Sequence, residues 1–268
     1  MHQGRRHGGR GPGRLTVVSL GPGSEDLITP QCLAALERAE VLVGYTPYLD
    51  LVPEAAKAGK DLVSTGMRHE VDRAEAALDA ALDGRDVAVV SSGDAGVYGM
   101  AGLILEMVET RGLRDVLDME IMPGIPALTA AAALLGAPLT HDFAVISLSD
   151  LLTPWPVIER RLEAAAQADF TTAIYNPRSR RRHWQLGKAL ELLAAHRSPD
   201  TPVGLVRQAF RQDQAVSVHR LADFDPSAVD MVSIVIVGNA SSRIVGGRFG
   251  GDRMLTPRGY AGKYDLDK

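Results

Sequence analysis

The sequence contains a single cysteine, Cys32, and this scarcity excludes two kinds of site. One thiol can form neither an internal disulfide framework nor a cysteine-based metal cluster, and it fits a reducing cytoplasm. No apolar run approaches the roughly 20 residues of a membrane span. The first 14 residues, MHQGRRHGGRGPGR, are basic and glycine-rich without an apolar core, so they are not a secretory signal. We therefore expect a cytoplasmic protein with no membrane partner.

Lysine is also scarce, because only five of the 29 basic residues are lysine and the rest are arginine. A GC-rich genome explains such a bias without invoking function, although arginine forks also suit a ligand with several carboxylates or phosphates. The net charge is only −4, so nothing in the overall charge indicates nucleic acid.

Several motifs of common enzyme classes are missing. The seven histidines show no pairing at metal-ligand spacing, and there is no HExxH, so no metal site is predicted. No GxSxG motif or Cys/His pair indicates nucleophilic catalysis. Gly21-Pro22-Gly23 follows the first strand but is not GxGxxG, and Pro22 removes a backbone N–H from the loop. No Walker A lysine follows, which weakens NAD and ATP as ligands.

The first half of the chain alternates apolar strands with helices, which predicts a mainly parallel sheet covered by helices. Thr29 can cap the first helix, with Pro30 at its first position. The predicted strands are 15–20, 40–44, 61–64, 86–90 and 119–122, and the longer helices are 31–38, 71–82 and 102–110.

Pro123-Gly124-Ile125-Pro126 breaks this alternation, and we place the domain boundary there. Short, closely spaced strands late in the chain predict a mixed sheet with hairpins in the second half. Its predicted strands are 143–148, 170–175, 203–207, 215–220 and 231–237, and its helices are 127–135, 156–167 and 180–196. The predicted domains are a disordered basic head at 1–14, α/β domains at 15–122 and 123–245, and a loosely held tail at 246–268.

The stretch Val87–Gly102, VAVVSSGDAGVYGMAG, is a buried strand that enters a glycine-rich bend and then a helix. Such a bend exposes backbone groups to a small ligand in α/β folds. Asp94 in this bend could accept a ligand amine, cap the following helix, or do both.

Two basic clusters lie near predicted strand ends, Arg68-His69 with Arg73, and Arg178 with its three following arginines. Arg181 and Arg182 are expected on a solvated helix face. Arg68 and Arg178 lie on predicted loops and are better candidates for binding an anionic ligand.

Several of these stretches together resemble the tetrapyrrole (corrin/porphyrin) methyltransferases over about residues 15–245. They are LGPGSEDLIT (20–29), SSGDAGVYGMAG (91–102), PGIPALTAAAALLGAPLTHDF (123–143), SLSDLLTPW (147–155), YNPRS (175–179) and IVIVGN (234–239). The third and fourth stretches and TPRGY (256–260) most resemble the members that methylate C17 of precorrin-3B.

The resemblance implies two α/β domains with S-adenosylmethionine (SAM) in the cleft between them, in a homodimer. Pro126 departs from the family's usual hydroxyl-bearing residue, which puts a side-chain hydrogen bond there in doubt. By motif, the residues carried over to the cofactor are Pro22, Ser92, Gly93, Asp94, Val97, Pro126, Ala127, Asn176 and Ala209.

The implied activity is methylation of C17 of precorrin-3B, with ring contraction to precorrin-4, in cobalamin biosynthesis. The contraction releases a hydroxyl proton, so a base is expected, and the candidates are His69, Glu70, Tyr98 and His141. Arg68, Arg73 and Arg178 are the expected clamps for the carboxylates of the tetrapyrrole substrate.

Three alternatives stay open. Cobalt-factor III methyltransferases of the anaerobic pathway share the same motifs. A non-catalytic SAM- or corrinoid-binding partner is a second class, and a Rossmann-type dinucleotide enzyme is disfavoured by Pro22.

Overall fold

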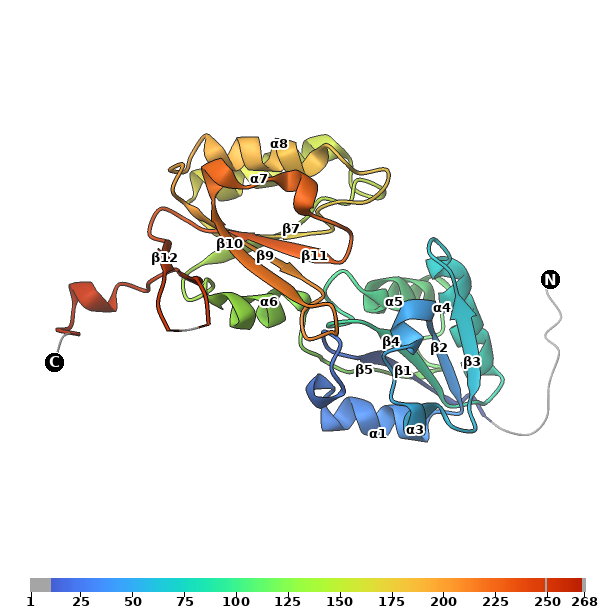
Figure 1. The fold of residues 1–268 in the computed structure, drawn as a ribbon. Helices are drawn as coiled ribbons and strands as arrows, with labels where there is room; N and C mark the ends of the chain where they lie inside the picture. Colours follow the sequence, from blue (N-terminus) through green and yellow to red (C-terminus); the bar gives the residue numbers. More distant parts are fainter. Residues whose placement is uncertain (1–10, 249, 267–268) are drawn as a thin grey trace. The chain divides into compact units, whose positions relative to one another are not determined.

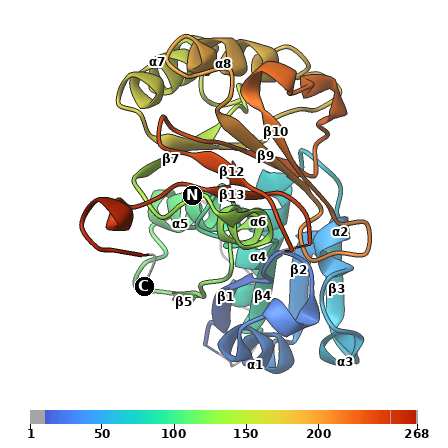
Figure 2. The same ribbon diagram turned by 60° about the vertical axis from the view of Figure 1, so that its left-hand side comes forward.

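The computed structural model describes residues 11–248 and 250–266, and the chain divides into two compact α/β units (Figures 1 and 2). The first unit ends at Ala127 and the second begins at Leu128, a few residues after the boundary placed from the sequence. Residues 1–10 of the basic head predicted at 1–14 lie outside the described residues, and Arg14 is the first residue of a strand.

The first unit contains a five-stranded parallel sheet in the order β3-β2-β4-β1-β5, as the alternating pattern predicts. Its strands are β1 (Arg14–Ser19), β2 (Val41–Tyr45), β3 (Asp61–Thr65), β4 (Val87–Ser91) and β5 (Asp118–Ile121). Its helices are α1 (Pro30–Arg38), α2 (Thr46–Leu49), α3 (Glu54–Lys57), α4 (Glu70–Leu82) and α5 (Met100–Thr110). Thr29 caps α1 as predicted, since its Oγ1 accepts from the Cys32 N–H at 3.2 Å.

Helices cover both faces of this sheet (Figure 1). Leu15 and Val17 pack in the core beneath α4 and α5, whereas Val18 packs with α1 on the other face. Successive residues of a strand point to opposite faces, so a strand buried on both faces must be apolar at nearly every position. This requirement explains the uninterrupted apolar character of β1 and β4.

The neighbouring strands β1 and β4 lead to opposite faces of the sheet, because α1 packs on one face and α5 on the other. The chain therefore diverges at the carboxyl ends of these two strands. Such a switch point leaves a crevice in which α/β proteins place their ligands.

The second unit contains a mixed sheet in the order β10-β9-β11-β8-β7, in which only β7 and β8 pair in parallel. The predicted mixed sheet is confirmed. Helices α7 and α8 cover one face and α6 covers the other (Figures 1 and 2). The elements are α6 (Ala127–Leu135), β7 (Phe143–Ser147), α7 (Trp155–Gln167), β8 (Thr171–Tyr175), α8 (Gln185–Ala194), β9 (Pro202–Arg207), β10 (Ala215–Arg220) and β11 (Ser233–Val237).

A small third sheet corrects the expectation of a loosely held tail after residue 245. It joins β12 (Arg243–Val245), β13 (Arg253–Leu255) and β6 (Gly136–Ala137). Met254 and Thr256 are fully buried. The pairing of β13 with β6 joins distant parts of the chain, so no local periodicity indicated it.

The helix predicted at 180–196 begins only at Gln185, and the preceding residues form a folded loop. The Ser179 N–H donates to the Arg182 carbonyl at 2.8 Å, and Arg182 Nε donates to the Asn176 carbonyl at 2.7 Å. Arg182 is therefore buried rather than exposed on a helix face, and burial lowers the pKa of its guanidinium while nearby Asp150 opposes this shift.

Among the described residues, no helix has the length and apolar character needed to span a membrane.

A buried arginine links several segments of the second unit. The Arg197 side chain is 1% exposed and lies 3.0 Å from Asp169 Oδ1. It donates to the carbonyls of Ala166 at 2.8 Å, Phe170 at 3.1 Å and Gly238 at 3.2 Å. Burial lowers the pKa of Arg197, and the charge of Asp169 opposes that shift.

We predict that Arg197→Met lowers the free energy of unfolding of the second unit by about 1–3 kcal/mol, because the carbonyls of Ala166, Phe170 and Gly238 lose their donor while Asp169 stays partly in water. Urea unfolding followed by tryptophan fluorescence measures this unit, since Trp155 and Trp184 are the two tryptophans of the chain. Arg160→Met, at an exposed position of α7, is the control. A loss no greater than that of the control would contradict the assigned role.

Candidate functional site

The loops after β1 and β4 are joined by a reciprocal pair of backbone hydrogen bonds. Gly21 N–H donates to the Gly93 carbonyl at 3.0 Å, and Gly93 N–H donates to the Gly21 carbonyl at 2.7 Å. Both residues have a φ of +69°, which a residue with a Cβ atom rarely adopts. The two glycines therefore bring these loops together at the switch point of the sheet.

The loop after β5 joins them through Ser19, which is fully buried at the end of β1. Its Oγ donates to the Met122 carbonyl at 2.6 Å and accepts from the Ala95 N–H at 2.9 Å. Gly124 is packed so closely that an added Cβ would lie 2.5 Å from the Gly93 carbonyl oxygen. Sequence reasoning missed Ser19, whose only signal is a hydroxyl in the apolar run LTVVSL.

Asp94 connects the loop after β4 to the loop after β5. Its Oδ1 accepts from the Gly96 N–H at 2.8 Å, and its Oδ2 accepts from the Gly124 N–H at 2.9 Å. The helix-cap alternative is wrong, because α5 begins at Met100 with Gly99 as its N-cap. Asp94 is half-buried, and each carboxylate oxygen has a further lone pair for a ligand donor.

The backbone donors of these loops are largely used within the loops themselves. A phosphate cradle instead requires backbone N–H groups directed at the ligand. The N–H groups that donate inside the loops belong to Gly21, Gly93, Ala95, Gly96, Val97 and Gly124. This arrangement fits a ligand with a cationic group better than a nucleotide phosphate.

The structure brings together the predicted cofactor residues of the first unit. An added Cβ on Gly93 would lie 3.6 Å from the Ala127 nitrogen and 3.7 Å from Pro126 Cα, which shows how closely the loops approach. The residues on these three loops are Pro22, Ser92, Gly93, Asp94, Val97, Pro126 and Ala127.

The two predicted cofactor residues of the second unit share one edge of its sheet. Asn176 follows β8 and Ala209 follows β9, and both strands run antiparallel to β11 between them. Asn176 has a φ of +49°, and its Nδ2 donates to Ser147 Oγ at 2.9 Å. Ser147, which the sequence did not single out, ends β7 at the same edge.

Strained backbone also gathers at the carboxyl ends of strands. Among the described residues, six non-glycine residues have a positive φ, and five of them lie on loops that follow β3, β4, β8 or β9. Strain of this kind persists where a surrounding structure holds it, often at ligand sites. The five are Arg68, Tyr98, Asn176, Gln208 and Phe210.

Three of the four candidate bases lie at the carboxyl edge of the first sheet. His69 and Glu70 follow β3, and Tyr98 follows β4. His69 Nδ1 is 2.7 Å from Asp72 Oδ2, while Glu70 Oε1 accepts from the Arg68 N–H at 3.3 Å. Tyr98 is 55% exposed.

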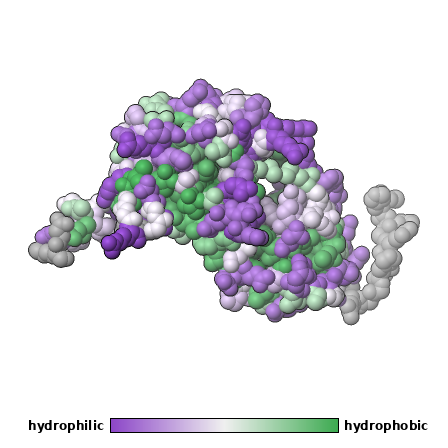
Figure 3. Space-filling model, in the orientation of Figure 1, coloured by the Kyte–Doolittle hydropathy of each residue, from purple (hydrophilic) through white to green (hydrophobic). Residues whose placement is uncertain are grey.

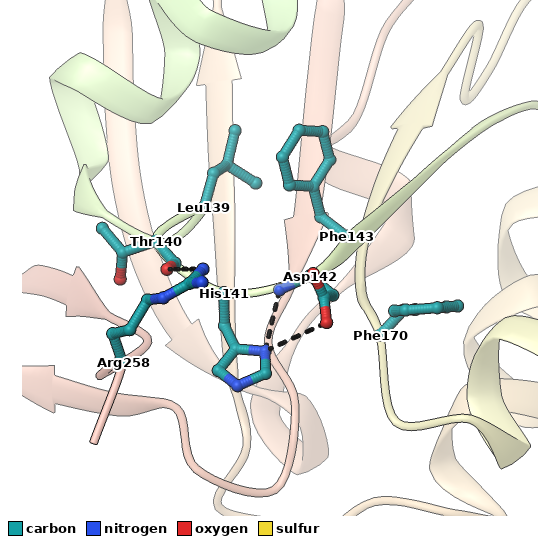
Figure 4. Close-up of a pocket in the computed structure, with 7 residues that line it drawn as sticks. All are labelled: Leu139, Thr140, His141, Asp142, Phe143, Phe170 and Arg258. Carbon is teal, nitrogen blue, oxygen red and sulfur yellow. Dashed lines mark hydrogen bonds and ion pairs between the residues drawn. The ribbon is translucent and has the colours of Figure 1, made fainter.

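The fourth candidate base, His141, lies elsewhere, in an open hollow of about 530 Å³ (Figure 4). The hollow is at the amino end of β7, opposite the edge that carries Asn176, so the structure does not bring these two residues together. His141 Nδ1 accepts from the Asp142 N–H at 2.8 Å. Leu139, Phe143 and Phe170 supply the apolar walls, and Arg258 supplies a guanidinium.

The predicted carboxylate clamps differ in exposure. Arg73 is 3% exposed, and it donates to Thr65 Oγ1 at 2.8 Å and to the Gly66 carbonyl at 3.1 Å. The clamp role predicted for Arg73 is therefore wrong, because its guanidinium is buried under the loop that carries Arg68. Arg68 is exposed, whereas Arg178 is half-buried and donates to the Pro226 carbonyl at 2.9 Å.

In the described part of the chain, no group of three or more His, Cys, Asp or Glu side chains could hold a metal ion.

Comparisons with known proteins identify the family of the chain. Two curated relatives are a probable cobalt-factor III C(17)-methyltransferase of Salmonella typhimurium, 50% identical over 92% of this chain and 99% of its own, and a precorrin-3B C(17)-methyltransferase of a Sinorhizobium species, 43% identical over 93% and 98%. The crystal structure of the methyltransferase CobJ is 44% identical, with a TM-score of 0.85 over 91% of this chain and 100% of that one. The model of the family described as tetrapyrrole (corrin/porphyrin) methylases matches residues 14–225. The chain belongs to the tetrapyrrole methylase family.

Proposed function

We propose that this protein transfers a methyl group from SAM to C17 of precorrin-3B, with ring contraction to precorrin-4, in cobalamin biosynthesis. The names of its relatives support this reaction, and one structural observation supports the methyl donor. In the three loops at the carboxyl edge of the first sheet, six backbone N–H groups donate within the loops, and the half-buried carboxylate of Asp94 keeps lone pairs for a ligand donor.

The residues present fit SAM, which carries an ammonium group, a carboxylate, a sulfonium and an adenine. Asp94 would accept from the ammonium group, and Gly93 would allow its close approach. Pro22, Val97 and Ala127 would supply apolar contacts. Asn176 and Ala209 would contribute from the second unit, and the placing of the cofactor between the two units stays a prediction.

When bound, SAM supplies a methyl group that a carbon nucleophile attacks directly. The protein's task is then to hold the acceptor carbon in line with that methyl group, and no covalent protein intermediate is required. His69, Glu70 and Tyr98 are the remaining candidates for accepting the hydroxyl proton that the ring contraction releases. Arg68 and Arg178 are the remaining proposed clamps for substrate carboxylates.

Cobalt-factor III is a second candidate substrate. The Salmonella relative with that name is 50% identical to this chain, compared with 43% for the precorrin-3B enzyme.

Incubation with SAM and each substrate separates the two candidates. We expect precorrin-3B to give a methylated, ring-contracted product. Mass spectrometry measures the added methyl group, and the absorbance spectrum reports the change in the ring. Product from cobalt-factor III alone would establish the second candidate. If the protein binds SAM but forms no product from either substrate, the proposed activity is wrong and the protein is a non-catalytic binding protein.

We predict that Asp94→Asn weakens binding of S-adenosylhomocysteine by about 10–100-fold, because a hydrogen bond to a charged group contributes about 1.5–3 kcal/mol. Calorimetry measures both affinities. 5′-Methylthioadenosine is the comparison ligand, because it lacks the amino-acid group that Asp94 would contact. Its affinity is expected to change little.

Asp83→Asn, an exposed carboxylate after α4, is the matched control for charge. Equal losses for both ligands in Asp94→Asn would show that Asp94 only braces the loops, and the proposed contact with the ammonium group would be wrong.

We also propose a cytoplasmic homodimer. Light scattering coupled to gel filtration measures the mass, and a monomer at micromolar concentration would contradict the dimer.

A further inference from the structure

Two loops at the carboxyl edge of the second sheet are fastened side by side. Residues 148–154 follow β7, and residues 176–184 follow β8. Gln185 Nε2 donates to Asp150 Oδ2 at 2.9 Å, and the rings of Trp155 and Trp184 meet edge to face at 4.7 Å. Together with the hydrogen bond between Asn176 and Ser147, these contacts hold the two loops next to each other at the edge of the sheet.

The two loops carry large apolar side chains that are exposed to solvent. Leu151 is 72% exposed, Leu152 is 98% exposed and Trp184 is 46% exposed. Isolated exposed leucines are ordinary. Two adjacent ones on a loop that is joined to the next by an edge-to-face tryptophan pair make an apolar patch, and such patches mark binding surfaces. We call Leu151, Leu152, Trp155 and Trp184 the apolar rim. By contrast, the outer face of the α7–α8 layer is mainly hydrophilic (Figure 3).

Two cations flank the apolar rim on the second loop. Arg180 and Arg181 are both exposed, and within the described ranges neither side chain has a hydrogen bond or an ion pair. The next residue, Arg182, is instead buried and holds the loop through the Asn176 carbonyl. The loop thus anchors one guanidinium inside and leaves two available to an anionic ligand.

We infer that the apolar rim with Arg180 and Arg181 binds the tetrapyrrole substrate. This inference rests on the proposed function. A tetrapyrrole of this class is a broad, largely apolar ring with carboxylates around its edge. Leu151, Leu152 and Trp184 would contact the ring, and the two arginines would pair with its carboxylates.

The place of the rim in the fold supports this occupant. Asn176, which the proposal assigns to the cofactor, lies at the base of the second loop and hydrogen-bonds to Ser147 at the base of the first. An acceptor carbon must lie beside the methyl donor, so a substrate surface is expected next to a cofactor residue. Exposed leucines alone would also suit a second copy of the chain, whereas two adjacent guanidinium groups beside them fit the carboxylates at the edge of a tetrapyrrole.

Quenching of tryptophan fluorescence by cobyrinic acid, a stable corrin with carboxylate side chains, measures binding in the full-length protein. We expect Leu151→Ser with Leu152→Ser, and separately Arg180→Ala with Arg181→Ala, to weaken its binding at least tenfold. The methyl ester of cobyrinic acid lacks the carboxylate charges, so we expect it to bind wild type and the arginine variant with similar affinity. Binding of S-adenosylhomocysteine is expected to stay unchanged in both variants.

Arg160→Ala with Arg161→Ala, two adjacent exposed arginines of α7, is the matched control and is expected to bind like wild type. Leu151→Met with Leu152→Met keeps an apolar surface and is expected to retain binding. Wild-type affinity in both rim variants would overturn the inference while leaving the proposed function standing. Loss of dimer in the leucine variant with unchanged probe binding would also overturn it, in favour of a second copy. Failure of the wild type to bind any corrin, with S-adenosylhomocysteine bound, would overturn both the rim and the proposed substrate.

Discussion

Ser19 Oγ hydrogen-bonds to the loops after β4 and β5 at the same time, and it does so from the end of β1. With Asp94 and the paired bonds of Gly21 and Gly93, it closes three loops into one framework at the switch point of the first sheet. Six backbone N–H groups of the framework donate within it, which distinguishes this site from a phosphate cradle. A ligand held there must rely on Asp94, apolar walls and close backbone approach.

The second unit uses its arginines in different ways. Arg197 and Arg182 are buried and donate to backbone carbonyls, so they fix the positions of strand ends and of Asn176. Arg180 and Arg181 extend into solvent from the same loop as Arg182. A run of four arginines in five residues thus divides between structural support and surface charge, which only the fold of the loop decides.

The sequence predicted the parallel first sheet, the mixed second sheet and the first helix with its Thr29 cap, because hydrophobic period and capping are local signals. It also indicated the glycine-rich bend. It missed β6, β12 and β13, whose pairing joins residues far apart in the chain. Ser19 and Ser147 act through partners on other strands, so no spacing rule identifies them. The burial of Arg73 and Arg182 was missed for a similar reason, since charge in a sequence indicates exposure unless tertiary contacts compensate for burial.

We propose that the framework around Ser19 and Asp94 is the SAM site. A crystal structure of the protein with S-adenosylhomocysteine tests it most directly. We expect the amine of the ligand to lie within hydrogen-bond distance of Asp94 and the ligand to contact the backbone at Gly93. Ligand bound away from the loops after β1, β4 and β5, for example in the hollow beside His141 and Arg258, would contradict it.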